Sequence, residues 1–206
     1  MKRRGILTVV SGFAGSGKGT VMKALLDKYD YALSISATTR SPRPGEEHGR
    51  EYFFLTREEF ESMIESDQLI EYAEYVGNYY GTPRRYVEDQ LERGQNVILE
   101  IEVQGALKVK EKYPDTLLLF LTPPSAEELK ARLVGRGTED EETIAKRMDR
   151  ASKEADVIEK YDYLVVNDRV EDCVEEVNRI ITSRQAAVSN NTELIQELKE
   201  ELLRVK

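Results

Sequence analysis

One short stretch constrains this chain more than any other, and it reads Gly12-Phe13-Ala14-Gly15-Ser16-Gly17-Lys18. It follows a continuous apolar run at Ile6–Val10, which is typical of a buried strand in a parallel sheet. Beyond it, apolar residues recur at helical spacing from Val21 to Leu26. A glycine-rich turn before a helix N-terminus lets backbone N–H groups surround an anion, and Lys18 adds a full positive charge. The sequence therefore predicts a phosphate-binding loop (P-loop) rather than an ordinary turn with a surface lysine.

The residues after Lys18 differ from the usual P-loop motif. The motif places a serine or threonine next, whose hydroxyl binds Mg²⁺, whereas this chain has Gly19 followed by Thr20. Successive helical side chains point about 100° apart, so Thr20 faces a different direction from the usual ligand. Thr20 stays a candidate metal ligand, either directly or through a water molecule.

The rest of the chain alternates between apolar strands and helices. Further buried strands are predicted at Val97–Ile101, Leu117–Leu121 and Tyr163–Val166, with helices between them. One of these helices is expected to begin with a capping box formed by Thr138 and Glu141. Alternation of this kind indicates an α/β protein with a parallel, doubly wound sheet flanked by helices.

The segment 34–94 breaks this alternation because it is rich in aromatic residues. Within it, Val76-Gly77-Asn78-Tyr79 predicts a hairpin turn between two strands. We expect an inserted lobe here, with a small antiparallel or mixed sheet and one or two helices. The 206 residues then form one domain, whose core comprises 1–33, 95–130 and 156–206.

The balance of charge and the cysteine content limit the partners of this chain. A formal net charge of -9 argues against general nucleic-acid binding, which usually needs a basic face. Any anion site must therefore use arginines gathered locally. The single cysteine, Cys173, allows no intrachain disulfide, and no apolar stretch is long enough to span a membrane. We expect a soluble cytoplasmic protein that binds neither nucleic acid nor membranes.

The stretch Ser36–Phe54 gathers arginines within this acidic chain. Arg40, Arg43 and Arg50 lie there among two prolines and two glycines. The residues alone are compatible with a solvated linker or with a turn that aims arginines at an anion. The phosphate loop earlier in the chain favours the second interpretation.

Several further motifs follow the P-loop in order. They are Ser36–Glu46 with Gly49 and Tyr52, then Glu71 ahead of Gly77–Thr82, then Glu100–Ala106, and last Pro123–Ser125 with Gly135–Thr138. Together they resemble guanylate kinase, a P-loop nucleoside monophosphate kinase that transfers a phosphoryl group from ATP to GMP. The resemblance runs from about Gly5 to about Arg184. It implies a P-loop NTPase-type sheet with a nucleoside-monophosphate-binding lobe and a lid at 131–155.

The resemblance implies an acceptor site for GMP, and for dGMP, in the inserted lobe. Arg40 and Arg43 would bind the phosphate through charge-assisted hydrogen bonds. A carboxylate such as Glu71 suits the N1–H and N2–H₂ donors of guanine, whereas adenine would present an acceptor to it. The implied GMP-binding residues are Ser36, Arg40, Arg43, Tyr52, Glu71, Tyr80, Thr82 and Glu100.

The resemblance also implies a donor site for ATP, with Mg²⁺ as cofactor. The implied ATP-binding residues are Gly12, Phe13, Ala14, Gly15, Ser16, Gly17, Lys18, Gly19, Thr20, Asn167 and Asp168. Lid arginines would neutralise charge on the transferring phosphoryl group. The implied catalytic residues are therefore Lys18, Arg40, Arg132, Arg136 and Arg147. The implied metal contacts are Thr20 and Glu102, directly or through water.

Two alternative functions stay open for such a sequence. The first is a kinase for another nucleoside monophosphate, against which Glu71 with Ser36 and Thr82 argues. The second is a guanylate-kinase-like module that binds proteins without catalysis. Lys18 and the lid arginines argue against that module.

A few other features receive no functional role. We interpret Arg50 and Arg150 as ordinary surface charges, His48 as exposed and Cys173 as a packing residue. The stretch Thr192–Lys206 has leucines four residues apart, which predicts a narrow amphipathic helix. Its partner and the oligomeric state stay undetermined.

Overall fold

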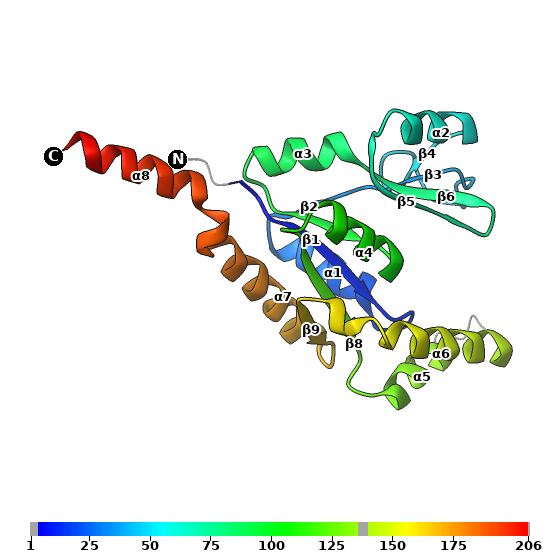
Figure 1. The fold of residues 1–206 in the computed structure, drawn as a ribbon. Coiled ribbons are helices and arrows are strands. Elements are labelled where there is room, and N and C mark those ends of the chain that lie inside the picture. Colours follow the sequence, from blue (N-terminus) through cyan, green and yellow to red (C-terminus); the bar gives the residue numbers. More distant parts are fainter. Residues whose placement is uncertain (1–3, 136–139, 206) are drawn as a thin grey trace.

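A parallel sheet forms the centre of the molecule (Figure 1). The structure is a computed structural model, and it describes residues 4–135 and 140–205. The sheet consists of β1 (Leu7–Gly12), β2 (Ala32–Leu33), β7 (Val97–Glu100), β8 (Leu117–Thr122) and β9 (Tyr163–Val166). Their order is β2-β7-β1-β8-β9, and every pairing is parallel. The predicted α/β class is therefore confirmed, although the two-residue β2 carries no apolar run that could have announced it.

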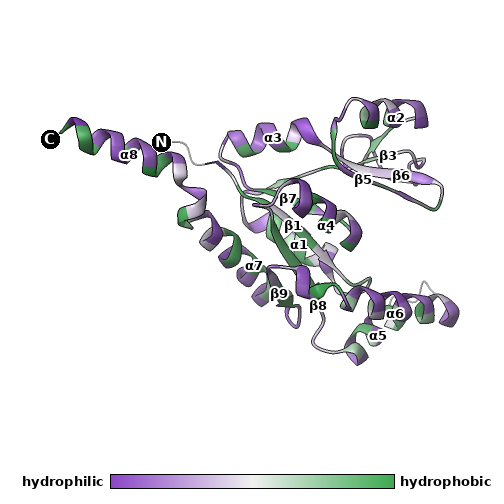
Figure 2. Ribbon diagram, viewed as in Figure 1, coloured by the Kyte–Doolittle hydropathy of each residue, from purple (hydrophilic) through white to green (hydrophobic). Residues whose placement is uncertain are grey.

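Helices cover both faces of this sheet because its strands are apolar on both sides. Val10 packs in a cluster with residues of α1 (Lys18–Lys28) and α7 (Val170–Gln185). The preceding residue, Val9, points the other way and packs with α3 (Arg84–Glu92) and α4 (Val103–Lys112). Figure 2 shows the apolar residues gathered on the central strands and the hydrophilic ones on the outer helix surfaces.

A second sheet lies beside the core between residues 37 and 83. It has four strands in the order β4-β3-β6-β5, with β3 and β4 parallel and the other pairs antiparallel. The strands are β3 (Ala37–Thr38), β4 (Phe53–Phe54), β5 (Leu69–Tyr75) and β6 (Asn78–Pro83), and α2 (Arg57–Glu65) accompanies them. Phe60 of α2 is fully buried against this sheet. We call these elements the lobe.

The predicted hairpin turn connects β5 to β6. Val76 and Gly77 both have positive φ, at 51° and 72°. A two-residue turn with positive φ at both positions is the type I′ geometry that matches the twist of antiparallel strands. The turn therefore sets the register that brings Glu71 on β5 opposite the end of β6.

Two helices, α5 (Ala126–Gly135) and α6 (Glu141–Ala155), form a small separate cluster. Asp140 caps α6, and its side chain accepts a hydrogen bond of 2.8 Å from the Thr143 N–H. The expected capping box of Thr138 with Glu141 is wrong, because Glu141 is already the first helical residue. Thr138 itself lies outside the described residues. Figure 1 shows this helix pair and the lobe on opposite sides of the carboxyl ends of the core strands.

The C-terminal part leads away from the sheet. Two short 3₁₀ turns, η1 (Ile158–Lys160) and η2 (Val188–Asn190), precede β9 and α8 (Thr192–Arg204) respectively. The predicted amphipathic helix is thus confirmed as α8, which has no buried residue and projects outward (Figure 1). Within residues 4–135 and 140–205, no helix has the length and apolarity needed to cross a membrane.

Candidate active site

The glycine-rich turn at Gly12–Lys18 joins β1 to α1, as its sequence predicts. Gly15 and Gly17 have φ values of 95° and 85°, in the region that favours glycine. A Cβ on Gly17 would lie 2.4 Å from Nδ2 of Asn167. Glycine is therefore required at this position by both the backbone conformation and the close approach of Asn167.

Side chains from two segments that are distant in sequence bind the backbone of this turn. Asn167, which follows β9, donates a hydrogen bond of 2.8 Å from Nδ2 to the Ser16 carbonyl. Arg132 of α5 donates to the same carbonyl at 3.3 Å and to the Asn167 carbonyl at 3.0 Å. Its Nε also donates to Glu128 at 2.7 Å. These contacts fix the backbone of the turn before any nucleotide binds.

Two polar atoms next to the turn have no partner of their own. The Ser16 hydroxyl and the Asn167 Oδ1 are buried, and neither has a hydrogen-bond partner among the described residues. Lys18 is half-buried at the start of α1, and Thr20 is exposed two residues later in the same turn. A buried polar group without a partner usually marks a place where a ligand or water completes the hydrogen bonding. The residues present therefore fit a phosphate chain at this turn.

In the lobe, Glu71 of β5 and Thr82 of β6 form a buried polar pair. Glu71 is 8% exposed and Thr82 is 1% exposed. The Thr82 hydroxyl donates a hydrogen bond of 2.8 Å to Oε1 of Glu71. Burial raises the pKa of the Glu71 carboxyl above its ordinary value. The pair thus holds a carboxylate ready to accept hydrogen bonds in a site with little water.

Gly105 of α4 makes room for this carboxylate. A Cβ at Gly105 would lie 3.1 Å from Oε2 of Glu71, which is tighter than ordinary van der Waals contact. The first turn of α4 therefore acts as the floor beneath Glu71. The sequence analysis did not assign this glycine a role, because its partner lies 34 positions away in the chain.

Arg40 lies in an aromatic and acidic setting in the lobe. Its guanidinium lies 5.4 Å from the Tyr52 ring centroid and makes two hydrogen bonds to Glu46, of 2.9 and 3.0 Å. Tyr80 lies next to Tyr52, with ring centroids 6.0 Å apart. Three of the predicted GMP-binding residues, Arg40, Tyr52 and Tyr80, are thus gathered in one place.

Glu46 is a member of this cluster that the sequence analysis missed. Its carboxylate also accepts a hydrogen bond of 2.7 Å from the backbone N–H of Arg43. The hydrogen bond from Arg40 holds the pKa of Glu46 below its ordinary value. An acidic residue six positions after Arg40, inside the same turn, was the signal that could have identified it. The Arg43 side chain points to solvent.

The other predicted lobe residues are less enclosed. Ser36 is half-buried, and its carbonyl accepts a hydrogen bond of 2.9 Å from the Phe53 N–H. Glu100 is exposed at the end of β7. Burial raises the pKa of the Tyr52 hydroxyl, with a smaller contribution in the same direction from Glu100.

Arg150 is exposed, as expected for a surface charge, and it also links two elements. Its guanidinium forms an ion pair with Glu102, which precedes α4, and another of 2.7 Å with Glu154. Arg150 therefore connects α6 to the core at one of the predicted metal-contacting residues. Among the described residues, no group of three or more His, Cys, Asp and Glu side chains is placed to hold a metal ion. Any Mg²⁺ here would take most of its ligands from phosphate and water.

The remaining predicted residues have the following positions. Arg147 is half-buried on α6, and Asp168 is exposed after β9. Arg136 lies outside the described residues. Arg50 forms ion pairs with Glu47 at 3.0 Å and Glu51 at 2.6 Å, on the surface of its loop.

Comparison with known proteins gives one consistent family. A family model described as guanylate kinase matches residues 4–184. A guanylate kinase of Halalkalibacterium halodurans is 55% identical over 184 residues, which cover 88% of this chain and 90% of that protein. One from Lactococcus lactis subsp. lactis is 53% identical, covering 91% of this chain and 92% of that protein. The crystal structure of guanylate kinase from Anaplasma phagocytophilum has a TM-score of 0.74 at 33% identity, covering 91% of this chain and 90% of the other.

Proposed function

This chain belongs to the guanylate kinase family, and we propose how its own residues carry out the family's reaction. The reaction is the ATP-dependent phosphorylation of GMP to GDP. The observation that carries the assignment of residues is the buried Glu71–Thr82 pair in a chain that also has a braced P-loop. The Glu71–Thr82 pair supplies a hydrogen-bond acceptor for guanine, and the P-loop supplies a binding site for a phosphate chain.

The lobe binds the acceptor nucleotide. The Glu71 carboxylate accepts hydrogen bonds from N1–H and N2–H₂ of guanine, and the Ser36 hydroxyl donates to O6 or N7. The Thr82 hydroxyl, which donates its hydrogen bond to Glu71, lines the base pocket and holds that carboxylate in place. Arg40, with Tyr52 and Tyr80 beside it, binds the phosphate. Arg43 and Glu100 complete the phosphate and base contacts respectively. Because the ribose 2′-OH has no part in these contacts, the same lobe also accepts dGMP.

The core binds the donor nucleotide. Backbone N–H groups of Gly12–Thr20 and the Lys18 ammonium hold the phosphates of ATP, at the N-terminus of α1. Asn167 keeps the turn in shape, and Asp168 next to it faces the nucleoside. Mg²⁺ would neutralise charge on the phosphates, and Thr20 and Glu102 would contact its water shell.

Phosphoryl transfer needs positioning and positive charge rather than a covalent intermediate. Lys18 and Arg40 approach the transferred group from the donor and acceptor sides. The arginines at 132, 136 and 147 contribute charge from the lid at 131–155 and exclude water. The single cysteine, Cys173, is buried and has no disulfide partner, which supports a reducing cytoplasm as the place of reaction.

A coupled ADP-release assay with ATP, Mg²⁺ and one acceptor at a time tests this proposal. We expect GMP and dGMP to turn over, and AMP to be rejected by about 10⁴-fold or more in kcat/KM. Glu71→Gln should lower kcat/KM for GMP by about 10-fold to 10²-fold, because a charged acceptor is lost. Equal turnover of AMP or UMP would show that the assignment of the base pocket is wrong. Binding of GMP without turnover would instead indicate a non-catalytic module.

A further inference from the structure

Two lysines of α4 attach that helix to the outer edge of the lobe's sheet. β5 is an edge strand, so some of its carbonyls have no strand to pair with. Lys108 donates a hydrogen bond of 3.1 Å to the Tyr72 carbonyl, and Lys112, one helical turn later, donates at 3.3 Å to the Leu69 carbonyl. Both lysines therefore extend from the same face of α4 across the junction between core and lobe.

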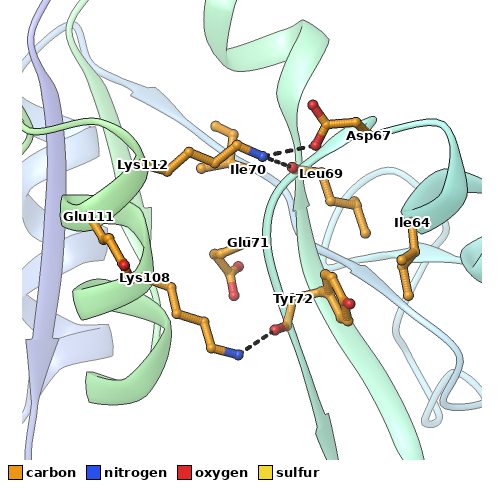
Figure 3. Close-up of a pocket in the computed structure, with 9 residues that line it drawn as sticks. All are labelled: Ile64, Asp67, Leu69, Ile70, Glu71, Tyr72, Lys108, Glu111 and Lys112. Carbon is orange, nitrogen blue, oxygen red and sulfur yellow. Dashed lines mark hydrogen bonds and ion pairs between the residues drawn. The ribbon is translucent and has the colours of Figure 1, made fainter.

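Glu71 lies between these two contacts. Figure 3 shows its side chain directed toward α4, inside a cavity of about 340 Å³ that both lysines border. Oε1 of Glu71 accepts the Thr82 hydrogen bond, and Oε2 lies over Gly105. The Lys108 ammonium and the Glu71 carboxylate thus line the same cavity from its two walls.

The two lysines differ in what else they bind. Lys112 forms an ion pair of 2.9 Å with Asp67, and Asp67 also pairs with Arg84 at 2.6 Å. Lys108 forms no ion pair within residues 4–135 and 140–205. The other charged side chain on this wall is Glu111. Lys108 is therefore the cation of the cavity whose charge is not already balanced by a carboxylate.

We propose that Lys108 is a positioning residue for guanine recognition, which keeps the buried Glu71 in its charged carboxylate form. The inference rests on the proposed function, in which Glu71 accepts the N–H donors of guanine. A protonated Glu71 would present an O–H toward those donors and lose an acceptor. Burial disfavours the charged form of Glu71, so guanine binding depends on a nearby positive charge that stabilises the carboxylate.

The electrostatics around Glu71 agree with this role. Burial raises the pKa of Glu71, whereas the Thr82 hydrogen bond and the charge of Lys108 act in the opposite direction. Removal of the lysine charge takes away one of the two opposing effects. The pKa of Glu71 then rises further. As the pH is lowered, guanine binding is therefore lost at a higher pH than in the parent protein.

The test is a calorimetric titration of GMP into the full-length protein without ATP, from pH 5.5 to 8.5. Lys108→Gln should move the acid-side midpoint of GMP affinity upward by about half a unit to one unit. The ratio of its Kd to that of the parent should grow as the pH is lowered, toward a limit of about threefold to tenfold, and the two Kd values should converge as the pH rises. The phosphate of GMP also titrates near pH 6, but it contributes equally to both proteins.

Three further variants separate charge from structure. Lys108→Arg keeps the charge and should keep the parent midpoint, and Lys112→Gln is the matched control on the same helix face. In the double variant with Glu71→Gln, the Lys108→Gln change should have no effect on the pH dependence. A uniform loss of affinity at every pH, or the same shift from Lys112→Gln, would overturn the inference.

The outcomes also separate this inference from the proposed function. If Glu71→Gln binds GMP as the parent does, the assignment of the guanine pocket is wrong and Lys108 has no such role. If Glu71→Gln weakens binding but Lys108→Gln leaves the midpoint unchanged, only the role of Lys108 is wrong.

Discussion

Glu71 shows how one side chain can prepare a binding site and weaken the fold that carries it. The carboxyl is enclosed by β6 and α4, and its burial disfavours the charged form. In the unfolded chain the same group is surrounded by water and ionises near 4.5. The folded protein therefore binds more protons than the unfolded chain in the pH range just above that value, and stability falls as pH rises through that range.

Glu71→Gln should stabilise the nucleotide-free protein at neutral pH. The amide has no charge to desolvate and still accepts the Thr82 hydrogen bond. The gain in Tm should be largest at pH 8 and should disappear near pH 4, where the parent carboxyl is protonated in both states. Thermal unfolding of both proteins at the two pH values measures it. An equal gain at both would show that the charge of Glu71 is not the cause.

Lys18→Met should remove turnover while leaving the acceptor site intact. Lys18 lies at the start of α1, whereas the proposed GMP contacts, apart from Glu100, lie in the lobe. We expect kcat to fall by at least about 10²-fold, since a positive charge at the transferred phosphoryl group is lost. GMP affinity, measured by calorimetry, should stay within about twofold. A parallel loss of GMP binding would point to a misfolded protein.

At the scale of elements, the phosphate loop depends on segments that follow it by more than a hundred residues. Asn167 and Arg132 meet at the Ser16 carbonyl, and both come from loops or helices beyond the lobe. The resemblance implies that Asn167 binds ATP, and a contact with the adenine is one form that this binding could take. Its buried amide makes it a brace for the loop in this structure, and a contact with adenine stays a prediction.

Asn167→Ala should therefore weaken the fold as well as ATP binding. Loss of its hydrogen bond should lower the free energy of unfolding by about 1–3 kcal/mol and raise KM for ATP severalfold. The preference for ATP over GTP as donor should stay unchanged. Asp168→Ala, at the exposed neighbouring position, is the control for stability. A changed donor preference with unchanged stability would show that Asn167 contacts the base instead.

Some elements could be predicted from sequence and others could not, for physical reasons. The run Leu117–Thr122 is continuous and apolar because it is buried on both faces. Strands of this kind can be recognised from the sequence alone. The strand Ala37–Thr38 has two residues and exists through pairing with Phe53 and Gly81, which no local pattern encodes.

The candidate site divides in the same way. The P-loop motif is a run of adjacent residues, and so the sequence was sufficient to predict it, whereas its distant contacts with Asn167 and Arg132 could not be predicted. Arg150 has a local partner at Glu154, typical of a solvated helix face, and its second partner Glu102 is 48 positions away. Gly105 and Glu46 likewise acquire their roles from residues that only the fold or the turn brings near.

At the scale of the whole molecule, only the start of α8 lies beside the core, and the rest of the helix projects outward. It has no buried residue, and the region that matches the family ends at residue 184. Leu198, Leu202 and Leu203 are exposed along it. The helix α7 before it, by contrast, buries Val174, Val177 and Ile181 in the core. Stability and catalysis should therefore depend on the chain up to the end of α7.

A chain ending at Asn191 should fold and react as the whole chain does. Asn191 keeps its own hydrogen bonds, of 3.0 and 2.7 Å, to the carbonyls of Gln185 and Ala187. We expect Tm to change by less than about 2 °C and kcat/KM for GMP to stay within about twofold, because exposed residues away from such contacts contribute little. A large fall in Tm would mean that α8 packs on something else, such as a second copy of the chain.

The ion pair of Arg40 with Glu46 has a consequence for which anions the lobe admits. An incoming anion has to replace the carboxylate of Glu46 at Arg40. Because Glu46 is only six positions from Arg40 in the chain, its effective concentration there is high. Chloride or a free carboxylate carries one negative charge, as Glu46 does, and so gains no electrostatic advantage by replacing it. A phosphate ester carries nearly two charges and three oxygens, so it can displace the internal competitor. Singly charged anions, which are abundant in the cell, therefore do not displace Glu46 from Arg40, and the lobe selects for doubly charged phosphate groups.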